Sequence, residues 1–174
     1  MILIAIGSNL SMKSVLSPLD LCEQAAADLA LLDGLSLVAA SRWYRSAPIP
    51  RSDQDDYVNG VARFEGQIEP RMLMDHLHRI EQLGGRERSV ANAARTLDLD
   101  LIDCNGLVSA GPYPVLPHPR AHERAFVLAP LIDVAPGWIH PALGETAEAL
   151  LARLLPQDIT RIALPLRNRK RSPK

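Results

Sequence analysis

Hydrophobic residues follow the spacing of β-strands in three stretches within the first 65 residues of the chain. Residues 2–6 form a continuous apolar run, which is typical of a strand buried on both faces. Further strands are predicted over residues 35–44 and 57–65, and the last of these alternates regularly. Because side chains two apart share one face of a strand, Tyr57 and Asn59 should point to the same side and share a ligand there.

Between and after these strands, apolar residues recur at helical spacing. A first helix is predicted over residues 18–33, because Ser17 provides an N-cap and Pro18 occupies the first helical position. A second is predicted over residues 70–83, which begin at a proline and end before two glycines. Towards the C-terminus, a short helix, a longer helix and a last strand are predicted over residues 126–131, 145–155 and 159–166.

The stretch R-T-L-D-L-D-L-I-D at residues 95–103 is the most informative part of the chain. Asp98 and Asp100 are two apart, so a strand places both carboxylates on one face and the leucines on the other. Adjacent carboxylates repel one another unless a cation, a proton or an arginine lies between them, and Mg2+ is the usual cation beside phosphate. A half-exposed strand with a solvated face shows the same pattern. Asp103 is out of phase and is expected on the opposite face, outside any site.

The order of predicted elements through residue 104 is β-α-β-β-α-β, which indicates an α+β fold. This order matches a ferredoxin-like plait, an antiparallel sheet with both helices packed on one face, here followed by C-terminal additions. The other face of the sheet is expected to be available to ligands. Asn105-Gly106 predicts a tight turn with a strand returning from Leu107. The length favours one domain, residues 1–166, and the basic tail over residues 167–174 is expected to be disordered.

Composition narrows the classes of function. A net charge of -1 and a pI of about 6.5 argue against a protein dedicated to nucleic acid or to a membrane surface. No apolar run approaches the ~20 residues needed to cross a bilayer. Cys22 and Cys104 have no metal-like spacing, so both are expected to be reduced core thiols of a cytoplasmic protein.

Cationic residues flank the two aspartates on both sides. One group precedes them and another follows, namely Arg86, Arg88 and Arg95, then His118, Arg120 and Arg124. Arginine forks and a divalent cation are complementary ways to neutralise a triphosphate, so their combination favours phosphoryl transfer. Tyr57 and Phe126 are two of only seven aromatic residues, and together with the Asn59 amide they suit a flat heterocycle. Judged alone, Phe126 is equally compatible with a place in the core.

Six motifs resemble those of the 6-hydroxymethyl-7,8-dihydropterin pyrophosphokinase family and together span nearly the whole chain. They are A-I-G-S-N-L at 5–10, Y-R-S-A-P-I at 44–49, D-Q-D-D-Y-V-N-G at 53–60, R-I-E-Q-L-G-G-R-E-R at 79–88, R-T-L-D-L-D at 95–100 and L-P-H-P-R-A-H-E-R-A-F-V-L-A-P-L at 116–131. The last two are the most specific. The resemblance implies the α+β plait as the fold. It also implies Mg2+-dependent transfer of pyrophosphate from ATP to 6-hydroxymethyl-7,8-dihydropterin, which gives the pterin diphosphate and AMP in folate biosynthesis.

Carried over position by position, the resemblance implies a role for each matching residue. Asp98 and Asp100 would bind two Mg2+ ions and would act in catalysis together with Arg86 and Arg95. The residues implied to contact ATP are Arg86, Arg88, Arg95, His118, Arg124 and Glu81. The residues implied to contact the pterin are Tyr57 and Phe126 on its faces, with Asn59, Ser46, Pro48 and Ile49 along its edge. No protein partner is implied.

One departure and two rival functions qualify this picture. Many relatives carry Trp-Gly-Pro immediately before the arginine matching Arg95, whereas this chain has Asn92-Ala93-Ala94, so an aromatic seal is missing there. Gly-Ser with D-x-D also occurs in metal-dependent nucleotidyltransferases, but there the two motifs lie within about a dozen residues, whereas here they are about ninety apart. A non-catalytic nucleotide-binding module is the other alternative, and the intact pair Asp98 and Asp100 argues against it.

Overall fold

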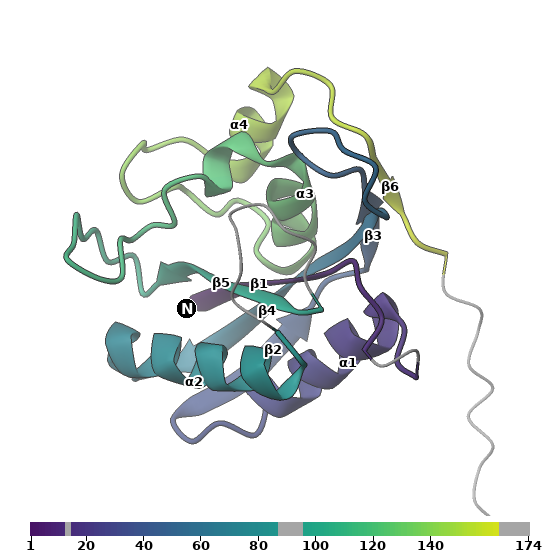
Figure 1. Ribbon diagram of the computed structural model, residues 1–174. Helices are drawn as coiled ribbons and strands as arrows, with labels where there is room; N and C mark the ends of the chain where they lie inside the picture. Colours follow the sequence, from purple (N-terminus) through teal and green to yellow (C-terminus); the bar gives the residue numbers. More distant parts are fainter. Residues whose placement is uncertain (13–14, 87–95, 164–174) are drawn as a thin grey trace, which may run out of the picture.

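An antiparallel sheet separates two layers of helices (Figure 1). The computed structural model describes residues 1–12, 15–86 and 96–163. The strands pair in the order β5-β1-β4-β3-β6, and β2 also pairs with β4. The strands are β1 (Ile2–Ser8), β2 (Leu35–Ala40), β3 (Tyr44–Ser46), β4 (Tyr57–Gly66), β5 (Asp98–Cys104) and β6 (Ile159–Arg161). The helices are α1 (Pro18–Leu29), α2 (Pro70–Leu83), α3 (Ala125–Val134) and α4 (Ala147–Arg153), with a 3-10 turn, η1, at Ala121–Glu123.

The first two helices begin where their sequences predict. Ser17 caps α1, because its hydroxyl accepts a hydrogen bond from the Asp20 backbone N–H at 3.2 Å, and the Asp20 carboxylate accepts the N–H of Ser17 in return. Glu69 caps α2 in a similar way through the N–H of Met72. The first residue of each helix is a proline. Because proline has no backbone N–H, no acceptor is needed at that position.

The two helical layers enclose separate cores. On one face of the sheet, α1 and α2 contribute Leu29 and Leu77 to a cluster that includes alternate residues of β1. On the other face, α3 and α4 pack over Leu3 and Ile102. The predicted plait leaves this second face open to ligands. The C-terminal helices instead cover part of it, because α3 is apolar on nearly all sides and has to be buried.

The strand predicted over residues 35–44 is divided into β2 and β3. The register of β2 against β4 shifts between Leu37 and Ala39, and the N–H of Val61 then donates to the Ser41 hydroxyl instead of a backbone carbonyl. Pairing with β4 resumes at Tyr44 and continues through Ser46, which was predicted to lie in irregular structure. The split brings Ser46 onto the sheet beside β4.

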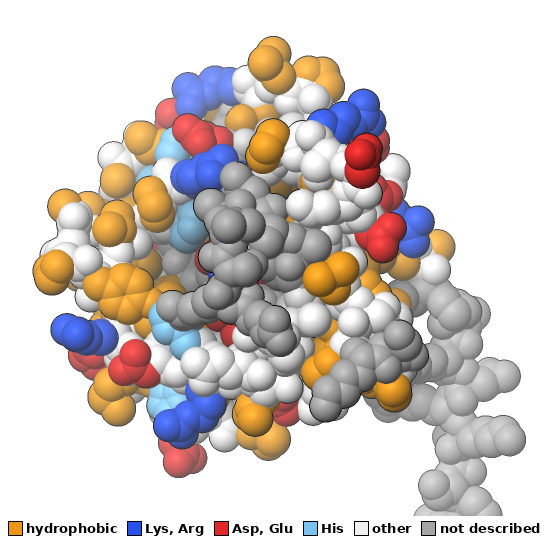
Figure 2. All heavy atoms as spheres, viewed as in Figure 1, with side chains coloured by type: hydrophobic (Ala, Val, Ile, Leu, Met, Phe, Trp, Pro, Cys, Tyr) orange, Lys and Arg blue, Asp and Glu red, His pale blue; other side chains and the backbone are white. Residues whose placement is uncertain are grey.

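The strand predicted to return from Leu107 is not formed. The turn itself is confirmed, since Asn105 and Gly106 both have positive φ angles, 54° and 72°. The following segment, residues 107–117, contains three prolines that cannot donate to a ladder, and it makes only an isolated bridge between Ser109 and Leu116. Several of its apolar side chains stay exposed, where orange spheres gather at the left of Figure 2.

Gly60 on β4 allows the close approach of Trp43. A Cβ atom at this position would lie 2.5 Å from the Trp43 ring, which is nearly buried. We therefore expect Gly60→Ala to destabilise the protein by about 1–3 kcal/mol through overpacking, as measured by urea denaturation. In a Trp43→Leu background the added methyl group has more room, so the penalty should shrink. An equal penalty in both backgrounds would contradict this origin.

Three further expectations concern the chain as a whole. Cys22 and Cys104 are buried free thiols, as predicted. Among the described residues, no helix combines the length and hydropathy required to cross a membrane. Arg88, Arg95, Asn92 and the basic tail over 167–174 lie outside the described residues.

Candidate active site

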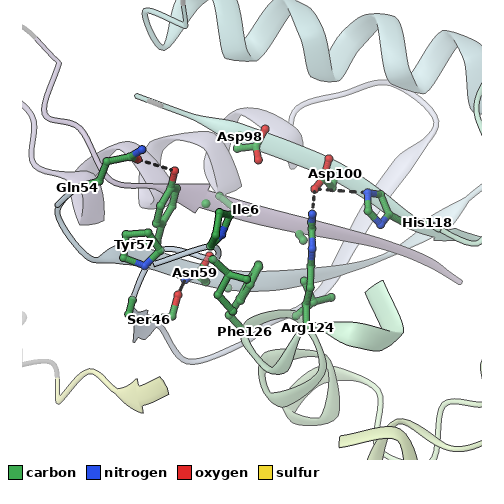
Figure 3. Close-up of a pocket in the computed structure, with 18 of the residues that line it drawn as sticks. Ile6, Ser46, Gln54, Tyr57, Asn59, Asp98, Asp100, His118, Arg124 and Phe126 are labelled. Carbon is green, nitrogen blue, oxygen red and sulfur yellow. Dashed lines mark hydrogen bonds and ion pairs between the residues drawn. The ribbon is translucent and has the colours of Figure 1, made fainter. Parts of the chain in front are cut away.

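A cavity of about 400 Å3 opens on the part of the sheet that α3 leaves uncovered. Such a volume suits a small-molecule ligand. Its floor consists of β1 and β4, and its walls are the segment after β3, the aspartates of β5 and the start of α3 (Figure 3). Ten of the residues predicted from the sequence line it, namely Ser46, Pro48, Ile49, Tyr57, Asn59, Asp98, Asp100, His118, Arg124 and Phe126. Segments far apart in the sequence therefore meet at one site.

The two aspartates lie on the same face of β5, as their spacing predicted. β5 pairs with β1 in a register that sets Asp98 opposite Gly7 and Asp100 opposite Ala5. Both small residues also line the cavity, so the sheet leaves space above the carboxylates. The side chains of Asp98 and Asp100 are 22% and 30% exposed, and they remain accessible to a ligand.

Two arginines and a histidine converge on these carboxylates. Arg86 Nη1 lies 2.8 Å from an oxygen of Asp98. Arg124 Nη1 and His118 Nε2 lie 3.6 and 3.7 Å from Oδ2 of Asp100 (Figure 3). This arrangement lowers the repulsion between two carboxylates held side by side. It also places hydrogen-bond donors where an anionic ligand would enter.

His118 is oriented by the backbone. Its Nδ1 atom accepts the N–H of Arg120 at 3.2 Å, so the neutral ring carries its proton on Nε2, which faces Asp100. Burial lowers the pKa of His118 below its usual value, although the neighbouring Asp100 carboxylate opposes the change. At neutral pH, His118 therefore supplies an N–H donor without a full charge.

The opposite end of the cavity is lined by two aromatic rings and is called the flat end below. In Figure 3 the rings of Tyr57 and Phe126 stand on either side of Asn59, whose amide donates to the Ser46 hydroxyl at 3.0 Å. The Arg124 guanidinium lies 5.6 Å from the centre of the Phe126 ring and so connects the flat end to the charged end. Phe126 also packs against the core beneath α3 and α4, so its ring is shared between the core and the cavity wall, and its contact with a ligand stays a prediction.

Gln54 is a cavity residue that was not predicted from the sequence. Its side-chain oxygen accepts hydrogen bonds from the Tyr57 hydroxyl at 3.4 Å and from the Asn9 amide at 3.2 Å, and it lines the cavity. Gln54 belongs to the D-Q-D-D-Y-V-N-G motif, and membership of that motif was the only indication from the sequence that it lies at the site. Gln54 ties the loop before β4 to the end of β1.

Glu81, predicted as an ATP contact, is not among the residues that line the cavity. It is buried on α2 behind β5, where its Oε1 atom accepts the Leu99 N–H at 2.8 Å and forms an ion pair with Arg86. Burial raises the pKa of Glu81 to about 7, against the lowering effects of the Leu99 N–H and of Arg86. The proton on this carboxyl is therefore held more tightly in the folded protein.

The raised pKa of Glu81 makes the stability of the folded protein depend on pH. Because the folded protein binds this proton more tightly than the unfolded chain does, protonated Glu81 stabilises the fold. That stabilisation is complete below pH 4.5, the ordinary pKa, and is lost as the pH rises through 7, the pKa in the folded protein. Relative to Glu81→Gln, the free energy of unfolding of the parent protein should fall by up to about 3 kcal/mol between pH 4.5 and 8. Denaturation without added metal would measure it. Asp75→Asn, an exposed change on the same helix, is the matched control for removal of an acidic side chain.

The donor chemistry of the cavity fits a hard divalent cation held jointly with phosphate. Mg2+ is usually bound through one or two carboxylates plus phosphate oxygens and water. Asp98 and Asp100 provide two such carboxylates on one face. Among the described residues, no cluster of three or more acidic, histidine or cysteine side chains could hold a metal ion by itself, without phosphate as a further ligand.

Comparison with known proteins gives a consistent result. The family model described as 7,8-dihydro-6-hydroxymethylpterin-pyrophosphokinase matches residues 3–136. The 2-amino-4-hydroxy-6-hydroxymethyldihydropteridine pyrophosphokinase of Haemophilus influenzae is 36% identical over 138 residues, which are 79% of this chain and 83% of the relative. Proteins of the same name from Synechocystis and from Methylorubrum extorquens are 38% and 33% identical, over 78% and 91% of this chain and 69% and 96% of their own lengths.

Proposed function

Because the chain belongs to the 7,8-dihydro-6-hydroxymethylpterin-pyrophosphokinase family, we propose that it transfers pyrophosphate from ATP to 6-hydroxymethyl-7,8-dihydropterin, forming the pterin diphosphate and AMP. The chain is thus a pyrophosphokinase, a transferase of folate biosynthesis. The observation that carries the proposal is a single cavity with a flat aromatic end and an end that pairs two carboxylates with cationic donors.

The flat end would hold the pterin. Phe126 and Tyr57 would stack on its two faces, as aromatic rings do with heterocycles. The Asn59 amide, fixed by Ser46, would hydrogen-bond the edge of the ring, and backbone groups near Pro48 would complete the recognition. This orientation would present the hydroxymethyl oxygen towards β5, where phosphate binds.

The charged end would hold the triphosphate. Asp98 and Asp100 would bind Mg2+, for which two ions are expected, and the metal when bound neutralises charge on the phosphate oxygens. Arg124 and the Nε2–H of His118 would donate to those oxygens, and Arg86 would do so beside Asp98. In the reaction, the hydroxymethyl oxygen would form a bond to the β-phosphorus while the bond between that phosphorus and the bridging oxygen of AMP breaks, and the hydroxyl proton would be released to solvent.

The finer assignments of fold and location are part of the same proposal. The order β5-β1-β4 with β2 and β3 beyond it supports a ferredoxin-like plait as the core of one domain spanning residues 1–166. Arg88 and Arg95 are proposed as further ATP contacts from sequence alone. A cytoplasmic location is proposed because the substrates are small metabolites and the thiols are unpaired.

One assay distinguishes this function from its rivals. Purified protein with ATP, Mg2+ and 6-hydroxymethyl-7,8-dihydropterin should release AMP and form the pterin diphosphate, both separable by chromatography. A nucleotidyltransferase would release pyrophosphate and join AMP to the acceptor instead. A non-catalytic module would bind ATP and release neither product, and folded protein that forms no AMP would overturn the proposal.

A further inference from the structure

Glu81 holds both the backbone and the side chain of Arg86. The chain leaves α2 through two glycines, and the Arg86 N–H then donates to the Glu81 carbonyl at 3.0 Å. The Arg86 guanidinium forms an ion pair with the Glu81 carboxylate. One buried residue therefore fixes both the backbone of Arg86 and the position of its guanidinium group.

The same carboxylate also supports the strand that bears the two aspartates. Among the strands that the structure describes, β5 is at the end of the sheet, and none of them pairs with its outer edge. Glu81 Oε1 accepts the N–H of Leu99 at 2.8 Å, and Leu99 lies between Asp98 and Asp100. Glu81 is 1% exposed, so the protein shields this hydrogen bond from solvent.

Arg86 is shared between two carboxylates of different kinds. Glu81 is buried, whereas Asp98 lines the cavity and is the proposed cation ligand. A cation at Asp98 would compete with the guanidinium for the same oxygens, because both are held by the same negative charge. With Glu81 in place, Arg86 would keep a partner when Asp98 takes the cation, and its remaining N–H groups would be available to the phosphates.

We propose that Glu81 is a positioning residue that acts on the nucleotide only through Arg86 and β5, without touching ATP. The inference rests on the proposed function for the identity of the ligand. It differs from the role implied by family resemblance, which is contact with ATP. Loss of the Glu81 charge would leave Arg86 paired with Asp98 alone. The arginine and the cation would then compete for the Asp98 carboxylate, and binding of one would displace the other.

A double-mutant cycle tests this inference by binding, independently of turnover. Calorimetry at pH 8, above the pKa of about 7 of Glu81, would measure the affinity of a non-hydrolysable ATP analogue with Mg2+ for the parent, Glu81→Gln, Arg86→Met and the double variant. Glu81→Gln should weaken binding about 10-fold, the value of one charged hydrogen bond, and should raise the Mg2+ concentration needed for half-saturation. In the Arg86→Met background the same change should have less than about a 2-fold effect.

Several results would overturn the inference. Independent losses from the two changes would indicate that Glu81 contacts the nucleotide itself. A lower melting temperature together with equal losses of pterin and nucleotide affinity would indicate a purely structural role. Asp75→Asn on the exposed side of α2 is the matched charge control and should leave nucleotide binding as in the parent. If coupling is observed but no AMP forms in the assay above, the proposed function fails while the positioning role stands.

Discussion

Asp98→Ala and Asp100→Ala should each lower kcat by about 1,000-fold or more while leaving the protein folded. Each change removes one of two carboxylates that face the cavity and are expected to bind Mg2+, and the metal contributes several kcal/mol of charge stabilisation in phosphoryl transfer. Both side chains are partly exposed, so their removal creates no buried void.

The affinity for free ATP provides a second signature of these variants. Arg86 pairs with Asp98, and both His118 and Arg124 face Asp100, so loss of a carboxylate leaves the cavity more positive. Free ATP should then bind at least as tightly as in the parent protein, even though turnover collapses. Steady-state kinetics and calorimetry would measure both quantities. Asp56→Ala, an exposed aspartate beside Tyr57, is the control, and unchanged kcat in the Asp98 and Asp100 variants would show that these residues form only a polar surface.

The placement of the two aspartates was predictable because it depends on local geometry. Alternation along a strand fixes which side chains share a face, and this was enough to pair Asp98 with Asp100 and Tyr57 with Asn59. Asp103 shows the limit of the same rule. A register shift of β5 against β1 lies next to it, and its carboxylate accepts the indole N–H of Trp138, which packs in the core beneath α3 and α4. The predicted opposite face is therefore wrong, although Asp103 does lie outside the cavity.

The role of the C-terminal third depended on tertiary packing and was harder to predict. An apolar helical pattern over residues 126–131 indicates a helix but does not say which side of a sheet it covers. The turn at Asn105-Gly106 indicated a returning strand, yet the prolines after it remove the donors that such a strand needs. Burial of Glu81 likewise depends on β5, which lies beside α2 in space but follows it in the sequence.

Phe126→Ala should weaken pterin binding by about 1–3 kcal/mol, roughly a 5- to 150-fold change in Kd, if the ring stacks on the substrate as aromatic side chains stack on bases. Phe126 stands at the start of α3 and lines the cavity across from Tyr57 (Figure 3). Its ring is also packed against the second core, so some loss of stability should accompany the change. Calorimetric titration with the pterin would measure the affinity, at a temperature where denaturation shows the variant to be folded.

Two comparisons separate stacking from a general loss of structure. Phe126→Tyr keeps an aromatic face and should restore most of the affinity, whereas Phe126→Leu keeps apolar volume without a π-face and should not. Tyr113→Ala removes a ring that is 43% exposed and is not among the residues lining the cavity, so pterin affinity should stay within about 2-fold of the parent. Because the Arg124 guanidinium lies over the Phe126 ring, Phe126→Ala should also weaken ATP binding, but less than it weakens pterin binding. Equal losses for both ligands would instead assign Phe126 to the scaffold that supports the charged end of the cavity.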